Sequence, residues 1–245
     1  CDIIFTAFAI GSIYYILCEK PITSLIFYGI ALSFKLQAIF LLPLFGILLI
    51  KNRIKIYHLL LVPISYLVLS IPSIIVGRPL KDILLIYVNQ SSEYTSLTSN
   101  APSIYQWFTG KFFSNTTLIG NIGIIFTLIV VFIIFYVSIK YIKIIKYENI
   151  IELALLFATI IPFLLPRMHE RYFFMADVIS LLYAFSFPKK FYIAILIPFA
   201  SLVCYLPFLY NTSTNYIIVA SVVFFIIIID LLYSFRIHII NKINN

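Results

Sequence analysis

Long apolar runs, separated by short stretches that hold most of the charge, occupy almost the whole of this 245-residue chain. Hydrophobic residues make up 63% of the sequence and charged residues only 11%, whereas soluble domains average about 25% charged residues. A helix needs roughly 20 predominantly apolar residues to cross a bilayer. The pattern therefore predicts an integral membrane protein and argues against soluble enzyme folds, nucleic-acid-binding modules and disulfide scaffolds.

The apolar runs predict about nine membrane-spanning helices. They lie at residues 3–18, 22–34, 38–50, 59–76, 118–139, 150–165, 173–187, 191–209 and 215–234. Every backbone amide in hydrocarbon must find its partner within the protein, so such segments form helices. We expect an all-α, polytopic transmembrane helical bundle, with residues 1–245 as a single transmembrane domain. Because the chain starts with Cys1-Asp2 and not with Met, we interpret it as the C-terminal part of a longer protein.

The basic residues predict which side of the membrane each connection faces. Eleven of the 17 Lys and Arg residues fall into five clusters: Lys20; Lys51, Arg53 and Lys55; Lys140, Lys143 and Lys146; Lys189 and Lys190; Arg236 and Lys242. Cytoplasmic loops are enriched in Lys and Arg, so we place these clusters in the cytoplasm. The other connections, at 1–2, 35–37, 77–117, 166–172 and 210–214, then face outward. The net charge of +8 therefore reflects topology and does not call for a nucleic-acid partner.

The segment between Lys20 and Lys51 is the least regular part of this topology. Both lysines must lie on one side, yet the segment is too long for one straight span and short for two. We expect a shallow pair of helices that meet near Lys35 and Gln37. The alternative is a single long tilted helix, which would invert everything before it.

Two groups of ionisable residues on the predicted outer face are candidates for a site. Four of them lie within five positions: Arg167, His169, Glu170 and Arg171. A helix that starts near Pro166 would put both arginines and Glu170 on one face, with Asp177 further along it inside an apolar run. An ionisable residue inside a span is by default a candidate functional residue. The alternative is a juxtamembrane anchor with an internal Arg–Glu pair.

Lys35 forms the second group with Asp2. Lys35 interrupts a long apolar stretch, and an ammonium is costly in the membrane unless it is paired or reaches water. Asp2, at the outer mouth of the first helix, is placed to pair with such a cation or to accept a proton. The alternative is that Lys35 extends to the outer membrane interface.

The long outer loop at 77–117 combines an amphipathic stretch with polar and aromatic residues. Residues 79–88 predict a helix that lies in the interface plane. Further along, the loop holds amides, a phenol and the only Trp of the chain: Asn100, Tyr105, Gln106 and Trp107. Sugars use such groups for hydrogen bonding and for stacking, although an interfacial aromatic belt explains the aromatic residues equally well.

With these segments in view, the chain resembles the bacterial membrane glycosyltransferases of the GT-C superfamily, in the group related to the mannosyltransferases of glycosylphosphatidylinositol-anchor synthesis. Five dispersed blocks carry the resemblance: Cys1-Asp2; Ser33-Phe34-Lys35-Leu36-Gln37-Ala38 running into Leu42-Pro43; Arg78-Pro79-Leu80; Asn100-Ala101-Pro102 with Tyr105-Gln106-Trp107-Phe108; and Pro166-Arg167-Met168-His169-Glu170-Arg171-Tyr172. Superfamily members carry an essential acid in their first outer loop. That loop, with the N-terminal spans, would precede Cys1.

The resemblance implies a multi-pass cell-membrane enzyme that transfers a sugar, such as mannose, from a polyprenyl-phosphate donor to a glycan or lipid acceptor on the extracytoplasmic face. Such a transfer needs a carboxylate for the acceptor proton and cations for the departing phosphate. The base is Asp2 or an acid upstream of Cys1. The expected site residues for catalysis are Asp2, Glu170 and His169. Those for the donor phosphate are Arg167, Arg171 and His169, with Lys35 assisting. Those for sugar and acceptor are Gln37, Asn100, Tyr105, Gln106, Trp107, Tyr172 and Asp177.

Two other functions remain open from the sequence. A transporter of lipid-linked oligosaccharides also has many spans and intramembrane cations, but it is expected to show paired repeats. A glycan polymerase or ligase would use a diphosphate-linked donor. The chain has no Asp-x-Asp motif, and Cys1, Cys18 and Cys204 are scattered. We therefore expect no metal and no cofactor.

Overall fold

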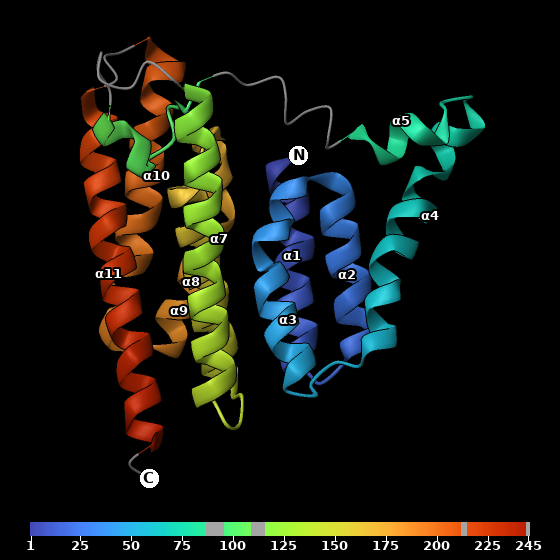
Figure 1. Ribbon diagram of the computed structural model, residues 1–245, viewed down its shortest axis with the longest axis horizontal. Helices are drawn as coiled ribbons and strands as arrows, with labels where there is room; N and C mark the ends of the chain where they lie inside the picture. The colour runs from blue at the N-terminus through green and yellow to red at the C-terminus, as the bar shows by residue number, and fades with distance from the viewer. Residues whose placement is uncertain (87–95, 109–115, 212–214, 244–245) are drawn as a thin grey trace.

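The protein is a bundle of helices that run between two opposite ends (Figure 1). A computed structural model describes residues 1–86, 96–108, 116–211 and 215–243, with side chains described as far as residue 239. Helical residues make up 83% of this described part, so the predicted all-α class is confirmed. Two short strands, β1 (Thr98–Ser99) and β2 (Met168–His169), form a parallel pair.

The first half of the chain forms one group of helices. Its elements are α1 (Asp2–Leu17), α2 (Pro21–Phe34), η1 (Leu36–Leu41), α3 (Leu42–Ile50), η2 (Ile56–Leu60), α4 (Leu61–Ile75) and α5 (Leu80–Leu84). In Figure 1, α1, α2 and α3 lie at the centre, α4 leans away at the right, and α5 lies at the upper end. The helix α2 ends where Lys35 adopts an extended backbone, so the predicted break near Lys35 and Gln37 is confirmed.

The second half forms the other group. Its elements are η3 (Ile104–Phe108), α7 (Thr116–Tyr141), α8 (Tyr147–Leu164), η4 (Glu170–Phe173), α9 (Phe174–Ser186), η5 (Pro188–Lys190), α10 (Ile193–Tyr210) and α11 (Asn215–Ile243). Figure 1 shows α7 in front of α8 and α11 along the outer left side. Every residue from Asn149 to Leu164 is buried, which makes α8 the central helix of this group.

Among the described residues, five helical segments are long and apolar enough to cross a membrane. They are Ile56–Ile75, Thr116–Tyr141, Tyr147–Leu164, Pro188–Tyr210 and Asn215–Ile239. The segments Asp2–Leu17, Pro21–Phe34 and Leu36–Ile50 are apolar but shorter, and α9 has 13 residues, about 20 Å of helix. Each apolar run of the sequence is thus helical, and the coarse expectation of an apolar, membrane-type helical protein is confirmed.

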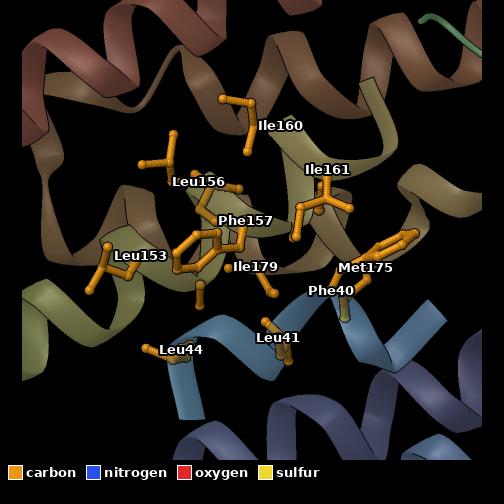
Figure 2. Packing of buried hydrophobic residues seen from close by; sticks show 14 of the residues in the cluster. Phe40, Leu41, Leu44, Leu153, Leu156, Phe157, Ile160, Ile161, Met175 and Ile179 are labelled. Carbon is orange, nitrogen blue, oxygen red and sulfur yellow. The ribbon is translucent and has the colours of Figure 1, made fainter. Parts of the chain in front are cut away.

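The two groups meet in an apolar core around α8 (Figure 2). Leu41 and Leu44 lie below α8 in this view, while Phe157 of α8 lies near Ile179 of α9. These four side chains are fully buried. Because lipid tails are as apolar as leucine, close packing holds such helices together more than the removal of apolar surface from water. The core therefore fixes α3 and α9 against α8.

A contact between a buried carboxylate and an imidazole links α8 to α11. Glu152 of α8 is fully buried, and both of its carboxylate oxygens contact His238 Nδ1, at 2.9 and 3.0 Å. The ring of Phe187 stacks on the His238 imidazole with centroids 5.1 Å apart. Nothing in the hydropathy pattern pairs these residues, because 86 positions separate them.

We expect this pair to contribute to stability. The variant His238→Ala leaves the Glu152 carboxylate buried without its partner, and this should lower the free energy of unfolding by about 3 kcal/mol. The variant Glu152→Gln keeps a hydrogen bond to the imidazole and should cost only about 1 kcal/mol. Unfolding by SDS in mixed micelles measures both values. Equal losses in the two variants would contradict a role for the buried carboxylate.

Candidate functional site

A cavity of about 770 Å³ lies where four distant segments meet. The segments are the start of α1, the break at Lys35, the corner between α4 and α5, and the connection between α8 and α9. The volume is within the range that small-molecule sites occupy. Its charged lining consists of four cations and one carboxylate, a net charge of +3: Lys35, Arg78, Arg167, Arg171 and Asp2. Such a lining favours an anionic ligand.

Lys35 is held inside this cavity by one carboxylate and two aromatic rings. Its ammonium forms an ion pair with Asp2. It also lies 5.5 Å from the ring centroid of Phe5 and 5.2 Å from that of Tyr172. Only 17% of the Lys35 side chain is exposed, because these groups surround it in the cavity lining. The sequence left two interpretations of Lys35, pairing with Asp2 or extension to the outer membrane interface, and these contacts match the first.

The connection after α8 does not form the predicted helix. The helix ends at Leu164, and Arg167 adopts the left-handed region with φ 63°. The Arg167 amide donates to the Leu97 carbonyl at 2.7 Å, and β2 then pairs with β1. The expectation of a helix from Pro166 is therefore wrong, because backbone pairing with the outer loop takes up these amides instead. Proline after a helix end favours such a departure.

This local structure places the ionisable residues in two layers. Arg167, Arg171 and Tyr172 line the cavity, whereas Glu170 turns inward and is buried. The Arg171 Nε lies 3.7 Å from Glu170 Oε1, and the His169 Nδ1 lies 3.9 Å from Glu170 Oε2. Glu170 thus stands directly behind the cationic wall and orients the groups on either side of it.

His169 is the titratable group at the junction of these layers. Burial lowers the pKa of His169 below its ordinary value of 6.5. The Glu170 carboxylate opposes this shift in pKa, while the charges of Arg171 and Lys35 add to it. His169 is therefore mainly neutral at pH 7, and its ring meets the Tyr172 ring edge-on at 5.6 Å. A neutral imidazole can both donate and accept a hydrogen bond.

Two residues of neighbouring helices extend the polar group into the bundle. Asp177 of α9 is half-buried, and within the described ranges its buried Oδ1 atom makes no hydrogen bond. Tyr205 of α10 lies within electrostatic reach of Asp177, Glu170, Asp2 and Arg171. Tyr205 is one of 18 tyrosines in an apolar chain, so no sequence signal distinguishes it. Arg78, by contrast, is a basic residue of the predicted outer loop at 77–117, so the sequence alone places it on the same face as the cavity.

The structure brings Gln37 and Tyr172 into the cavity lining but leaves the other five predicted sugar- and acceptor-binding residues outside it: Asn100, Tyr105, Gln106, Trp107 and Asp177. Tyr105 donates to the Leu164 carbonyl at 2.9 Å, and burial raises the pKa of Tyr105 to about 12. Gln106 donates to the Ala101 carbonyl at 3.0 Å. These bonds attach η3 to its own loop and to the end of α8.

Asn100 and Trp107 complete the contacts of this loop. Asn100 forms a backbone bridge with His169. Trp107 packs edge-on against Phe163 and Phe225, with centroids 6.1 and 5.1 Å away. The loop thus supports the β2 segment from behind. Of the loop at 77–117, residues 87–95 and 109–115 lie outside the described residues, so the predicted interfacial helix at 79–88 is represented by α5 alone.

The fold and the cavity define a class: a helical protein of the membrane type with a cationic, ligand-sized cavity among its helix connections. Comparison with known proteins does not take the identification further. No protein-family model, no curated protein and no solved structure matches the chain. The function must therefore be argued from the site itself.

Proposed function

We propose that the protein is a multi-pass membrane glycosyltransferase of the cell envelope. It transfers a sugar from a polyprenyl-phosphate donor to a glycan or lipid acceptor on the extracytoplasmic face, and its chain crosses the membrane about nine times. The observation that carries this proposal is the cavity that gathers Asp2, Lys35, Arg167 and Arg171 from three separate segments.

The direction of the helices supports the proposed sidedness. In Figure 1 the α1–α2, α3–α4 and α7–α8 connections lie at the lower end with the C-terminus, while the N-terminus and α5 lie at the upper end. The lower connections include Lys20 and the basic residues at 51–55 and 140–146. Basic connections favour the cytoplasm, so the cavity at the start of α1 would open to the opposite side.

The chemistry of the lining fits the proposed transfer. The acceptor oxygen forms a bond to the anomeric carbon while the bond from that carbon to the phosphate oxygen breaks. Asp2 takes the proton of the acceptor hydroxyl, and the electron pair leaves with the polyprenyl phosphate. The guanidinium groups of Arg167 and Arg171 stabilise that leaving phosphate, since their planar donors match pairs of phosphate oxygens.

Release of the lipid phosphate tests this function. Purified protein in detergent, given a polyprenyl-phosphate hexose labelled in the sugar and membranes as the source of acceptor, should produce labelled acceptor and free polyprenyl phosphate in equal amounts. A transporter would move the donor across sealed vesicles without consuming it. Intact donor, across a panel of hexoses and in the presence of such movement, would overturn the proposal.

A further inference from the structure

Arg78 occupies a corner whose local structure is strictly specified. The α4 helix ends with the Gly77 amide donating to the Ile74 carbonyl at 2.9 Å and the Arg78 amide donating to the Ser73 carbonyl at 3.0 Å. Gly77 has φ +93°, and a Cβ there would meet no atom within 4 Å. Glycine is thus required by the backbone and not by space, as in the Schellman termination of a helix.

A second contact closes the corner. The Tyr66 hydroxyl of α4 donates to the Ile83 carbonyl of α5 at 2.6 Å. This bond folds α5 back over the end of α4, so that Ile83 and Ile86 line the cavity together with Arg78 and Ser70. In Figure 1 this corner lies on the side of α1–α3 opposite to α7 and α8. Arg78 and Arg167 therefore approach the cavity from different elements.

Arg78 differs from Lys35 and Arg171 in its contacts with carboxylates. Lys35 is paired with Asp2, and Arg171 lies 3.7 Å from the Glu170 carboxylate. In the described part of the chain, the Arg78 guanidinium has no hydrogen bond and no ion pair. The Ile74 and Ser73 carbonyls at the end of α4 already accept hydrogen bonds from backbone amides, so they do not need a hydrogen bond from the Arg78 side chain.

A single phosphodiester does not account for this arrangement. A sugar joined to a polyprenyl phosphate carries one negative charge, and Arg167 with Arg171 offers it two guanidinium groups. Arg78 adds a further cation on another wall, where the apolar residues of α4 and α5 flank it. Arg78 is exposed at the cavity, so an anion that enters from outside can reach its guanidinium and form a charge-assisted contact there.

We infer that Arg78 marks a second anion subsite of the cavity, which binds a second phosphate group. The inference rests on the proposed function and deepens it. The phosphate comes from one of two sources: the head group of a phosphate-bearing acceptor lipid, which keeps the proposed monophosphate donor, or the second phosphate of a polyprenyl diphosphate, which would replace that donor. In the first case two lipids occupy the subsites together, and in the second case one ligand spans both.

Direct binding to the purified protein in uncharged-lipid nanodiscs tests the inference without relying on turnover. The variants are Arg78→Gln and Arg78→Lys, and the control is Lys81→Gln, an exposed cation three residues further that does not line the cavity. The probes are polyprenyl phosphate, polyprenyl diphosphate and phosphatidic acid. Loss of a charge-assisted guanidinium–phosphate contact should weaken binding by about 10- to 100-fold.

Three results are distinguishable. If Arg78→Gln weakens binding of the diphosphate but not of the monophosphate, one ligand with two phosphates is the source. If it removes binding of phosphatidic acid to protein saturated with polyprenyl phosphate, the acceptor lipid is the source. If all three probes bind Arg78→Gln as they bind Lys81→Gln, the inference is overturned. Absence of sugar transfer in the wild type, with these binding differences intact, would instead reject the proposed function alone.

Discussion

Asp2→Asn is expected to reduce sugar transfer by at least about 100-fold, the lower end of what a positioned general base contributes. Asparagine has nearly the same size but cannot take the acceptor proton. It also removes the negative charge beside Lys35, and this leaves the cavity more cationic. Donor binding should therefore be retained or become tighter while kcat falls. Steady-state kinetics with separate donor and acceptor titrations measures the two effects.

The matched control removes the same ion pair by replacing the lysine instead of the aspartate. Lys35→Gln leaves the Asp2 carboxylate in place but takes away a cation that lies over the Tyr172 ring. It should weaken donor binding, with a smaller loss in kcat than Asp2→Asn causes. If Asp2→Asn retains transfer within about threefold of wild type, the general base is another acid, and the role assigned to Asp2 fails.

The location of the helices could be predicted from the sequence because hydropathy reports it directly. Apolar runs and charged breaks are one-dimensional signals, and the break at Lys35 is visible for the same reason. The contact between Asp2 and Lys35 could also be anticipated. A cation and a carboxylate at the same end of adjacent apolar helices have few other partners.

The local conformation after α8 could not be predicted in this way. A helical pattern of charges from Arg167 to Arg171 suggested a helix, but the Arg167 amide and β2 bond to the outer loop near Leu97. Seventy positions separate those two segments, and spacing within one segment carries no information about the other. The same limit applies to Glu152 and His238, whose pairing depends on how α8 and α11 pack.

The consequence for the site is a change in which residues act together. The predicted helix would have placed Glu170 beside both arginines on one exposed face. In the structure Glu170 is buried, so it supports Arg171 and His169 from behind and does not line the cavity. A carboxylate set back from the lining does not repel a phosphate as strongly as one on the surface, and it still restricts the Arg171 side chain.

Arg171→Ala is therefore expected to lower kcat/KM for sugar transfer by about 100- to 1,000-fold, as the loss of one preorganised donor to a developing anion does. Arg171→Lys keeps the charge but loses the planar pair of donors, so its kcat/KM should fall between those of the wild type and Arg171→Ala. His169→Ala should also abolish transfer, because His169 contacts Glu170 on the other side and touches the Tyr172 ring. Protein yield and the accessibility of engineered cysteines verify that folding and topology are unchanged.

Arg53, at the opposite end of the helical bundle, offers a matched control for Arg171. Arg53 Nη1 lies 3.2 Å from Glu19 Oε1 in an exposed pair among the basic connections. Exposed ion pairs contribute little, so Arg53→Ala should leave both kcat/KM and stability close to wild type. A loss of activity in Arg171→Ala that Arg53→Ala reproduces would mean that a general loss of positive charge is responsible. Activity near wild type in both Arg171→Ala and His169→Ala would remove the phosphate site from this wall of the cavity.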